Sequence, residues 1–97
     1  MSADVVKVRW QYFIDGRDVT DSPDARGFAT DVKAWAGDAL AVALRRDGHS
    51  WVMSGSDYSL PDEAMEIRFR FPGEALCWVA QAVGVRQVIV DGAVTDD

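Results

Sequence analysis

The sequence predicts an α+β fold in which a four-stranded antiparallel sheet carries two helices on one of its faces. Two runs of residues alternate between apolar and polar side chains, which is typical of strands with one buried face. Two further stretches repeat their apolar residues with the period of a helix. With 97 residues, of which 48% are hydrophobic, the chain can form one core, so we expect a single domain over residues 1–97.

The first strand is predicted from about Val5 to Ile14. One side of it is apolar and the other is mostly polar. The apolar side holds Val6, Val8, Trp10, Tyr12 and Ile14, and the other side begins with Lys7, Arg9 and Gln11. Asp15 and Gly16 end the strand, and residues 15–30 predict a loop because they are rich in Asp, Gly, Ser and Pro.

A helix of about four turns is predicted over residues 32–45, with Thr30 or Asp31 as its cap. Its apolar residues recur at helical spacing: Val32, Trp35, Ala36, Ala39, Leu40 and Ala43. Gly48 would follow its carboxyl end. Gly37 lies inside this stretch, where a glycine destabilises a helix by about 1 kcal/mol relative to Ala. A glycine in such a position usually allows close packing of the helix against a neighbour.

The second half of the chain predicts a short strand at Ser50–Ser54 and a clearer one at Ala64–Phe71. In the latter, Met65, Ile67, Phe69 and Phe71 alternate with Glu66, Arg68 and Arg70. A second helix is predicted from Pro72 to Gly84, because proline suits a first turn and glycine a helix end. Its buried stripe would be Leu76, Val79, Ala80 and Val83. Val88–Val90 predicts the last strand, before Asp91–Gly92 and a polar tail.

This order of elements resembles the split βαβ, or ferredoxin-like, arrangement. Such a fold places the first and third strands side by side in the centre of the sheet. The core is then predicted to contain the apolar sides of these two strands with Trp35, Leu40, Leu76 and Val79. The opposite face would expose Lys7, Arg9, Arg68 and Arg70, so that an acidic chain has one basic face.

Two families with this order of elements are disfavoured by particular residues. Acylphosphatases use an anion-binding loop with an Arg after the first strand and an Asn on the second. Here the loop is acidic, Asp15-Gly16-Arg17-Asp18, and the chain has no Asn. The RNA-recognition motif displays aromatic residues on its open sheet face, where this sequence predicts Phe13 alone.

Charge and composition point to a protein partner. The net charge of −6 argues against direct binding to a nucleic acid and favours a partner with a basic surface. The repeated carboxylates Asp15, Asp18, Asp21 and Asp24 lack the alternate spacing of a calcium-binding loop, so we expect them to face a partner rather than a metal. Neither a metal nor another cofactor is predicted, because the glycines form no nucleotide-binding fingerprint and His49 is a lone histidine.

Trp78 is the strongest predicted interaction residue in the second helix. It falls almost opposite the buried stripe, and outward-facing tryptophans are enriched at interfaces. The alternative, that a loop or the polar tail covers Trp78, is equally open. We expect a cytoplasmic protein, because the amino terminus lacks the pattern of a secretory signal, no run of about 20 apolar residues is present, and the single Cys77 fits a reducing compartment.

These features predict a small acidic protein-binding module. Toxin-immunity proteins and anti-CRISPR proteins are similar to it in size and acidity, which implies an inhibitor or immunity-type protein that occupies a basic, nucleic-acid-handling site. The predicted contact residues are Trp78, Asp15, Asp18, Asp21, Asp24, Arg68 and Arg70. A homodimeric small-molecule-sensing or assembly domain is the alternative, and an enzyme ranks last.

Overall fold

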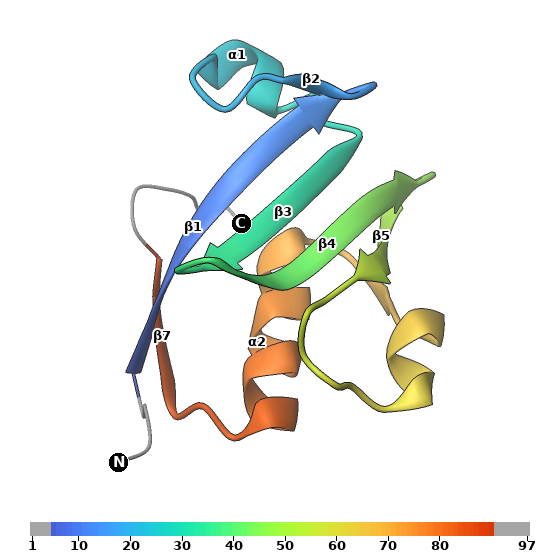
Figure 1. Ribbon diagram of the computed structural model, residues 1–97. Helices are drawn as coiled ribbons and strands as arrows, with labels where there is room; N and C mark the ends of the chain where they lie inside the picture. Colours follow the sequence, from blue (N-terminus) through green and yellow to red (C-terminus); the bar gives the residue numbers. More distant parts are fainter. Residues whose placement is uncertain (1–4, 91–97) are drawn as a thin grey trace.

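A seven-stranded sheet with one long helix on one face makes up the protein (Figure 1). The computed structural model describes residues 5–90. The strands are β1 (Val5–Ile14), β2 (Arg17–Asp18), β3 (Asp31–Ala36), β4 (Ala39–Asp47), β5 (Ser50–Gly55), β6 (Arg68–Phe69) and β7 (Gln87–Val90). The helical elements are α1 (Pro23–Arg26), the 3-10 turn η1 (Asp62–Glu66) and α2 (Pro72–Val83). The predicted ferredoxin-like fold, with four strands and two helices, is therefore wrong.

The strands follow the order β2-β1-β3-β4-β5-β6, and β7 pairs with β1. All pairs are antiparallel except β1 with β7, which is parallel. The long strand β1 uses Val5–Val8 to pair with β7 and 9–13 to pair with β3. The strand β6 lies beside β5 at the other end of the order, so the prediction that the first and third strands are neighbours is wrong.

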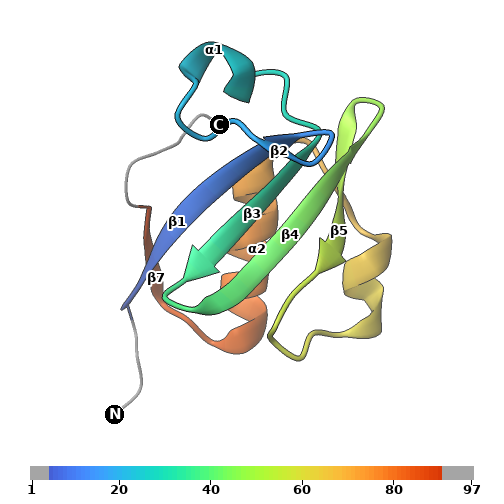
Figure 2. The ribbon, with the colours of Figure 1, turned by 45° about the horizontal axis from the view of Figure 1, so that its top comes forward.

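The predicted helix over residues 32–45 is instead the hairpin of β3 and β4, which is visible in both ribbon views (Figures 1 and 2). Gly37 has a φ of +63° in the turn between these strands. This left-handed conformation suits glycine and the two-residue hairpin turn, and it does not occur inside an α-helix. Val32 and Ala34 are buried with the period of two expected for a strand.

The predicted strand Ala64–Phe71 is also mostly wrong. Residues 62–66 form η1, in which Met65 is 55% exposed, and only Arg68–Phe69 pairs as a strand with β5. Phe71 precedes α2 and is 45% exposed. Four predictions are confirmed: the first strand, the strand at residues 50–54, the helix beginning at Pro72 and the last strand. The predicted tail after Val90 lies outside the described residues.

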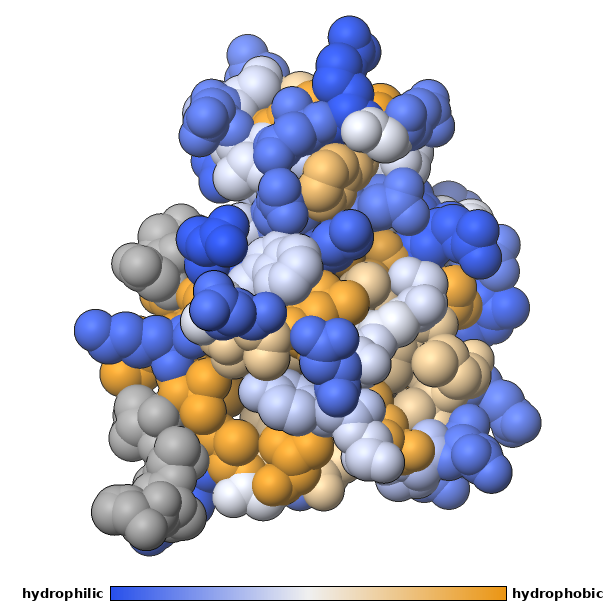
Figure 3. All heavy atoms as spheres, in the orientation of Figure 1, coloured by the Kyte–Doolittle hydropathy of each residue, from blue (hydrophilic) through white to orange (hydrophobic). Residues whose placement is uncertain are grey.

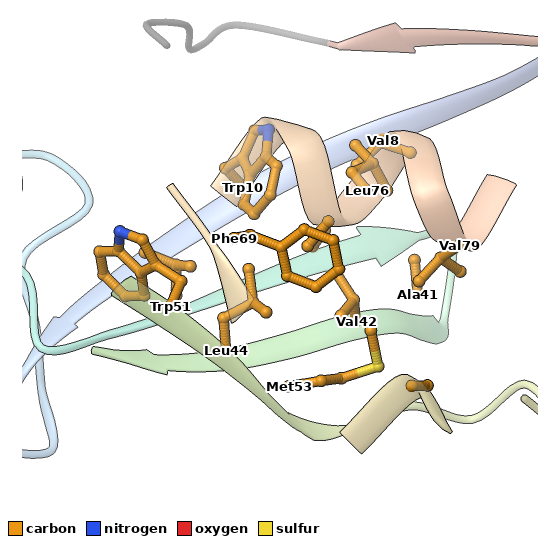
Figure 4. Packing of buried hydrophobic residues seen from close by; sticks show 14 of the residues in the cluster. Val8, Trp10, Ala41, Val42, Leu44, Trp51, Met53, Phe69, Leu76 and Val79 are labelled. Carbon is orange, nitrogen blue, oxygen red and sulfur yellow. The ribbon is translucent and has the colours of Figure 1, made fainter. Parts of the chain in front are cut away.

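The core lies between α2 and the face of the sheet that α2 covers (Figure 4). Leu76 and Val79 of α2 pack there with Phe69, which is 7% exposed. The helix ends at Gly84, whose left-handed φ of 85° allows its amide to bond back to Ala80 and Gln81.

Trp35 and Leu40 do not belong to this core, contrary to prediction. Trp35 pairs with Arg9, an exposed residue that lies between the buried Val8 and Trp10. Paired residues share a face and neighbours alternate, so Trp35 lies on the open face, away from α2, and Leu40, its partner on β4, lies there too.

The open face carries Lys7, Arg9 and Arg68, all exposed, together with Asp31 and Asp47, and Arg70 lies beyond the end of β6. The predicted basic face is therefore present only in part. Figure 3 shows the open face as a mixture of hydrophilic and hydrophobic residues. Trp35 donates a hydrogen bond from Nε1 to Gln11 Oε1 at 2.9 Å, so Phe13 is not the lone aromatic residue there.

Candidate functional site

Residues 15–30, which we call the docking segment, connect β1 to β3 and hold the four carboxylates predicted to face a partner. Asp15, Asp18, Asp21 and Asp24 are all exposed. The segment contains β2 and α1 and lies at the upper end of the sheet in Figure 1. Asp15 and Gly16 both have positive φ, 48° and 87°, which forms a tight turn and folds β2 back onto β1.

Hydrogen bonds to the end of β1 fix the course of the docking segment. The amide of Val19 donates to the carbonyl of Tyr12 at 2.8 Å, and the amide of Tyr12 donates to Thr20 Oγ1 at 2.9 Å. At its far end, the amide of Thr30 donates to the carbonyl of Phe13 at 2.8 Å. Both ends are therefore tied to β1, and the carboxylates are displayed on a backbone of defined shape.

Asp18 is the most strongly hydrogen-bonded carboxylate of the segment. Its Oδ1 accepts from the amide of Thr20 at 2.8 Å, and its Oδ2 accepts from Gln11 Nε2 at 2.9 Å. The backbone bond from Thr20, the Gln11 side chain and the Thr20 side chain together lower the pKa of Asp18. Asp18 thus stabilises the β2 turn as well as contributing charge to the surface.

Phe28, which sequence reasoning missed, is the most exposed large hydrophobic residue among those described. Its side chain is 74% exposed, although its amide is fixed by a 2.9 Å hydrogen bond to the carbonyl of Ala25. The sequence carried one signal for it, an isolated aromatic residue in a stretch of Asp, Gly, Ser and Pro. The docking segment therefore presents one aromatic side chain together with four carboxylates.

The other predicted contact residues lie elsewhere. Arg68 on β6 forms an exposed salt bridge from Nη1 to Asp47 Oδ2 at 2.7 Å, and β6 is at the opposite end of the strand order from β2. Arg70 is exposed between β6 and α2, where its amide donates to Glu74. The structure does not join these arginines and the acidic segment into one element.

Trp78 is half-buried in α2 and packs against the core cluster. It therefore contributes to packing in the isolated chain, and its contact with a partner stays a prediction. The tail proposed as its cover lies outside the described residues.

Side chains that could act as nucleophiles, general bases or metal ligands lie apart from one another within residues 5–90. His49 is exposed beside Gly48 in the turn between β4 and β5, and Cys77 is an exposed free thiol on α2. In this part of the chain no group of three or more His, Cys, Asp or Glu residues is arranged to hold a metal ion. None of its helices is long and apolar enough to cross a membrane.

No protein-family model, curated protein or solved structure matches this chain.

Proposed function

We propose that this protein is a small protein-binding module that uses the docking segment to occupy a basic surface of its partner. The exposure of Phe28 carries the proposal. A 74% exposed aromatic ring on a hydrogen-bonded segment is an anchor of the kind that dominates interface energies. The surrounding charge then determines which partner fits.

The carboxylates of the segment favour a basic partner. Four Asp residues outnumber Arg17 and Arg26 within it, and the whole chain has a net charge of −6. Such a surface accelerates association with a positively charged protein and disfavours acidic ones. A basic surface that handles nucleic acid is one such target, because displayed carboxylates can take positions normally occupied by phosphates. This is the reasoning behind an inhibitor or immunity-type role.

The alternative of a domain that dimerises through its sheet depended on the ferredoxin-like fold. The chain has another fold, so that analogy no longer supports the alternative.

Photo-crosslinking from two exposed hydrophobic positions tests the proposal. Benzoylphenylalanine placed at position 28 should crosslink a basic protein in cells of the native source, whereas the same group at position 65 should not. Met65 is the control because it is also an exposed hydrophobic residue, at 55%, and lies in η1, just before the strand β6 at the opposite end of the strand order from β2.

Charge variants provide the second half of this experiment. Reversing Asp21 and Asp24 to Lys should reduce the crosslink at position 28, since both side chains are exposed and neither stabilises the β2 turn as Asp18 does. Equal crosslinking from positions 28 and 65, or a crosslink unaffected by the charge reversal, would contradict the proposed surface.

A further inference from the structure

A groove of about 270 Å³ lies between the docking segment and the amino end of α2. Both ribbon views show the start of α2 directed toward the end of the sheet that carries α1 (Figures 1 and 2). The groove is mainly aromatic and positively charged. Its lining includes Trp10, Tyr12, Trp51, Phe71, Arg26 and Arg46. Its volume is close to the lower end of the range for small-molecule sites, roughly 300 Å³.

Four aromatic side chains form the apolar walls, two from β1, one from β5 and one at the start of α2. Trp10 and Trp51 are each only 6% exposed, so their rings are held in place by the core. Figure 4 shows both indoles at one end of the core, away from Val79. Tyr12 and the more exposed Phe71 also line the groove. Aromatic walls of this kind favour a planar apolar group.

Two arginines supply the charge of the groove. The Arg26 guanidinium lies 5.5 Å from the ring centre of Tyr12, and that of Arg46 lies 4.8 Å from the ring centre of Trp51. A guanidinium held on a ring face keeps its N–H groups at its edge, where they can donate to a carboxylate or sulfonate. Within residues 5–90 neither arginine has a salt-bridge partner.

The groove is positive although the chain as a whole is acidic. None of the described residues that line it is acidic. Three carboxylates adjoin lining residues in the sequence. Asp31 and Asp47 alternate with Val32 and Arg46 along β3 and β4 and so lie on the open face. Glu74 accepts hydrogen bonds from the amides of Arg70 and Phe71 at 2.9 and 3.2 Å. The Glu74 carboxylate therefore interacts with the backbone that precedes α2. Arg26 and Arg46 remain available to an anion.

We propose that this groove binds a small planar organic anion, an aromatic ring system that carries a carboxylate or sulfonate group. The ring lies against the aromatic walls and the acidic group pairs with Arg26 and Arg46. This site is separate from the docking of a protein on the exposed side of Phe28, and neither proposal requires the other.

The dye anilinonaphthalene sulfonate, a planar aromatic anion that fluoresces in apolar surroundings, is a direct probe. Titrated into the folded chain of residues 1–97, the dye should show saturable one-to-one binding and raise the melting temperature. Arg46→Gln should weaken binding about tenfold, as expected for a lost charge-assisted hydrogen bond. Neutral phenylnaphthylamine should bind more weakly than the sulfonate, and its affinity should not respond to Arg46→Gln.

Arg45→Gln is the matched control for this measurement. Arg45 pairs with Asp31 and Val52 on the open face, whereas its neighbour Arg46 pairs with Trp51 on the face covered by α2. The two variants remove the same charge one residue apart, and only Arg46→Gln should reduce affinity. An equal loss in both would overturn the proposal, because it would show general attraction of the dye to positive charge.

Two further outcomes complete the test. If Arg46→Gln alters the near-ultraviolet circular dichroism of the fold, Phe71→Ala replaces it, because Phe71 is 45% exposed and lines the groove. That variant should also weaken the dye about tenfold, within the range for truncated aromatic contacts. Dye affinity unchanged in Phe71→Ala, or dye binding that lowers the melting temperature, would refute the site.

Discussion

Gly37→Ala distinguishes the hairpin of β3 and β4 from the helix that the sequence predicts. In a helix this change stabilises the protein by about 1 kcal/mol. In the hairpin, Gly37 has a φ of +63°, and a Cβ there meets no heavy atom within 4 Å, so the cost comes from the backbone alone. An L-residue in this conformation costs roughly 1–2 kcal/mol, partly offset by roughly 0.4–1 kcal/mol from the stiffer unfolded chain. We expect a net destabilisation of about 1 kcal/mol.

Thermal unfolding followed by circular dichroism measures this difference. A loss of about 1 kcal/mol lowers the melting temperature of a domain of this size by roughly 4–8 °C. Gly37→Asn should recover most of the loss, since Asn tolerates positive φ. Gly27→Ala is the control, because Gly27 has a φ of −65° and a Cβ there is 3.8 Å from the Asp24 carbonyl oxygen. A Gly37→Ala variant that melts higher than the parent would refute the hairpin.

Three other substitutions test the core and the docking segment. Phe69→Ala removes a 7% exposed ring from the core and should cost about 3–5 kcal/mol in chemical denaturation; an unchanged midpoint would place the ring outside the core. Trp78→Ala should cost less, about 2 kcal/mol, because this side chain is half-buried against the same cluster; a neutral result would restore the sequence prediction of an outward-facing ring. The hydrogen bonds that lower the pKa of Asp18 stabilise the fold above the ordinary pKa of Asp, about 3.9, and this stabilisation is lost as the pH falls through the lower folded value. A carbon NMR titration should find the Asp18 carboxyl below about 3.9, and Asp18→Asn should remove part of the acid sensitivity of the melting temperature; a titration at or above the ordinary value would contradict these bonds.

The elements that sequence reasoning predicted correctly are those with unambiguous local signals. In β1, residues 6–12 alternate strictly between apolar and polar side chains, as expected for a half-buried strand. Pro72 at the start and Gly84 at the end mark α2, and the structure places both at its boundaries. Local chemistry and tertiary packing agree in these elements, so a single sequence is sufficient to identify them.

The stretch 31–47 was misread because small apolar residues fit either period. Alanine is a good helix former, and a register shift between Ala34 and Trp35 lets Ala41 and Val42 both be buried, which breaks the alternation of a strand. The Gly37-Asp38 pair was the local sign of a hairpin turn. The hairpin forms because β3 pairs with β1 and β4 pairs with β5. The local sequence pattern does not indicate this long-range pairing.

The candidate surfaces were predictable to different degrees. Exposure of Asp15, Asp18, Asp21 and Asp24 follows from their place in a polar loop. The groove could not be predicted from the sequence, because it forms only where the fold brings Trp51 of β5, Trp10 of β1 and the start of α2 together. The prediction that Trp35 and Leu40 share the core failed for the same reason, since it depended on a helix that does not form.

The docking segment contributes little to the core, which makes its proposed role in binding separable from folding. Of residues 15–30, only Ala29 belongs to the buried cluster, whereas β1, β4, β5 and α2 supply most of its members. Arg26 faces the groove and Phe28 is exposed to solvent, so one segment bears on both proposed surfaces. Substitutions at Phe28 or at Asp21 and Asp24 can therefore change binding while the melting temperature stays nearly constant. A planar anion in the groove would contact this segment through Arg26. The change in crosslinking at position 28 when the anion is added therefore measures how independent the two surfaces are.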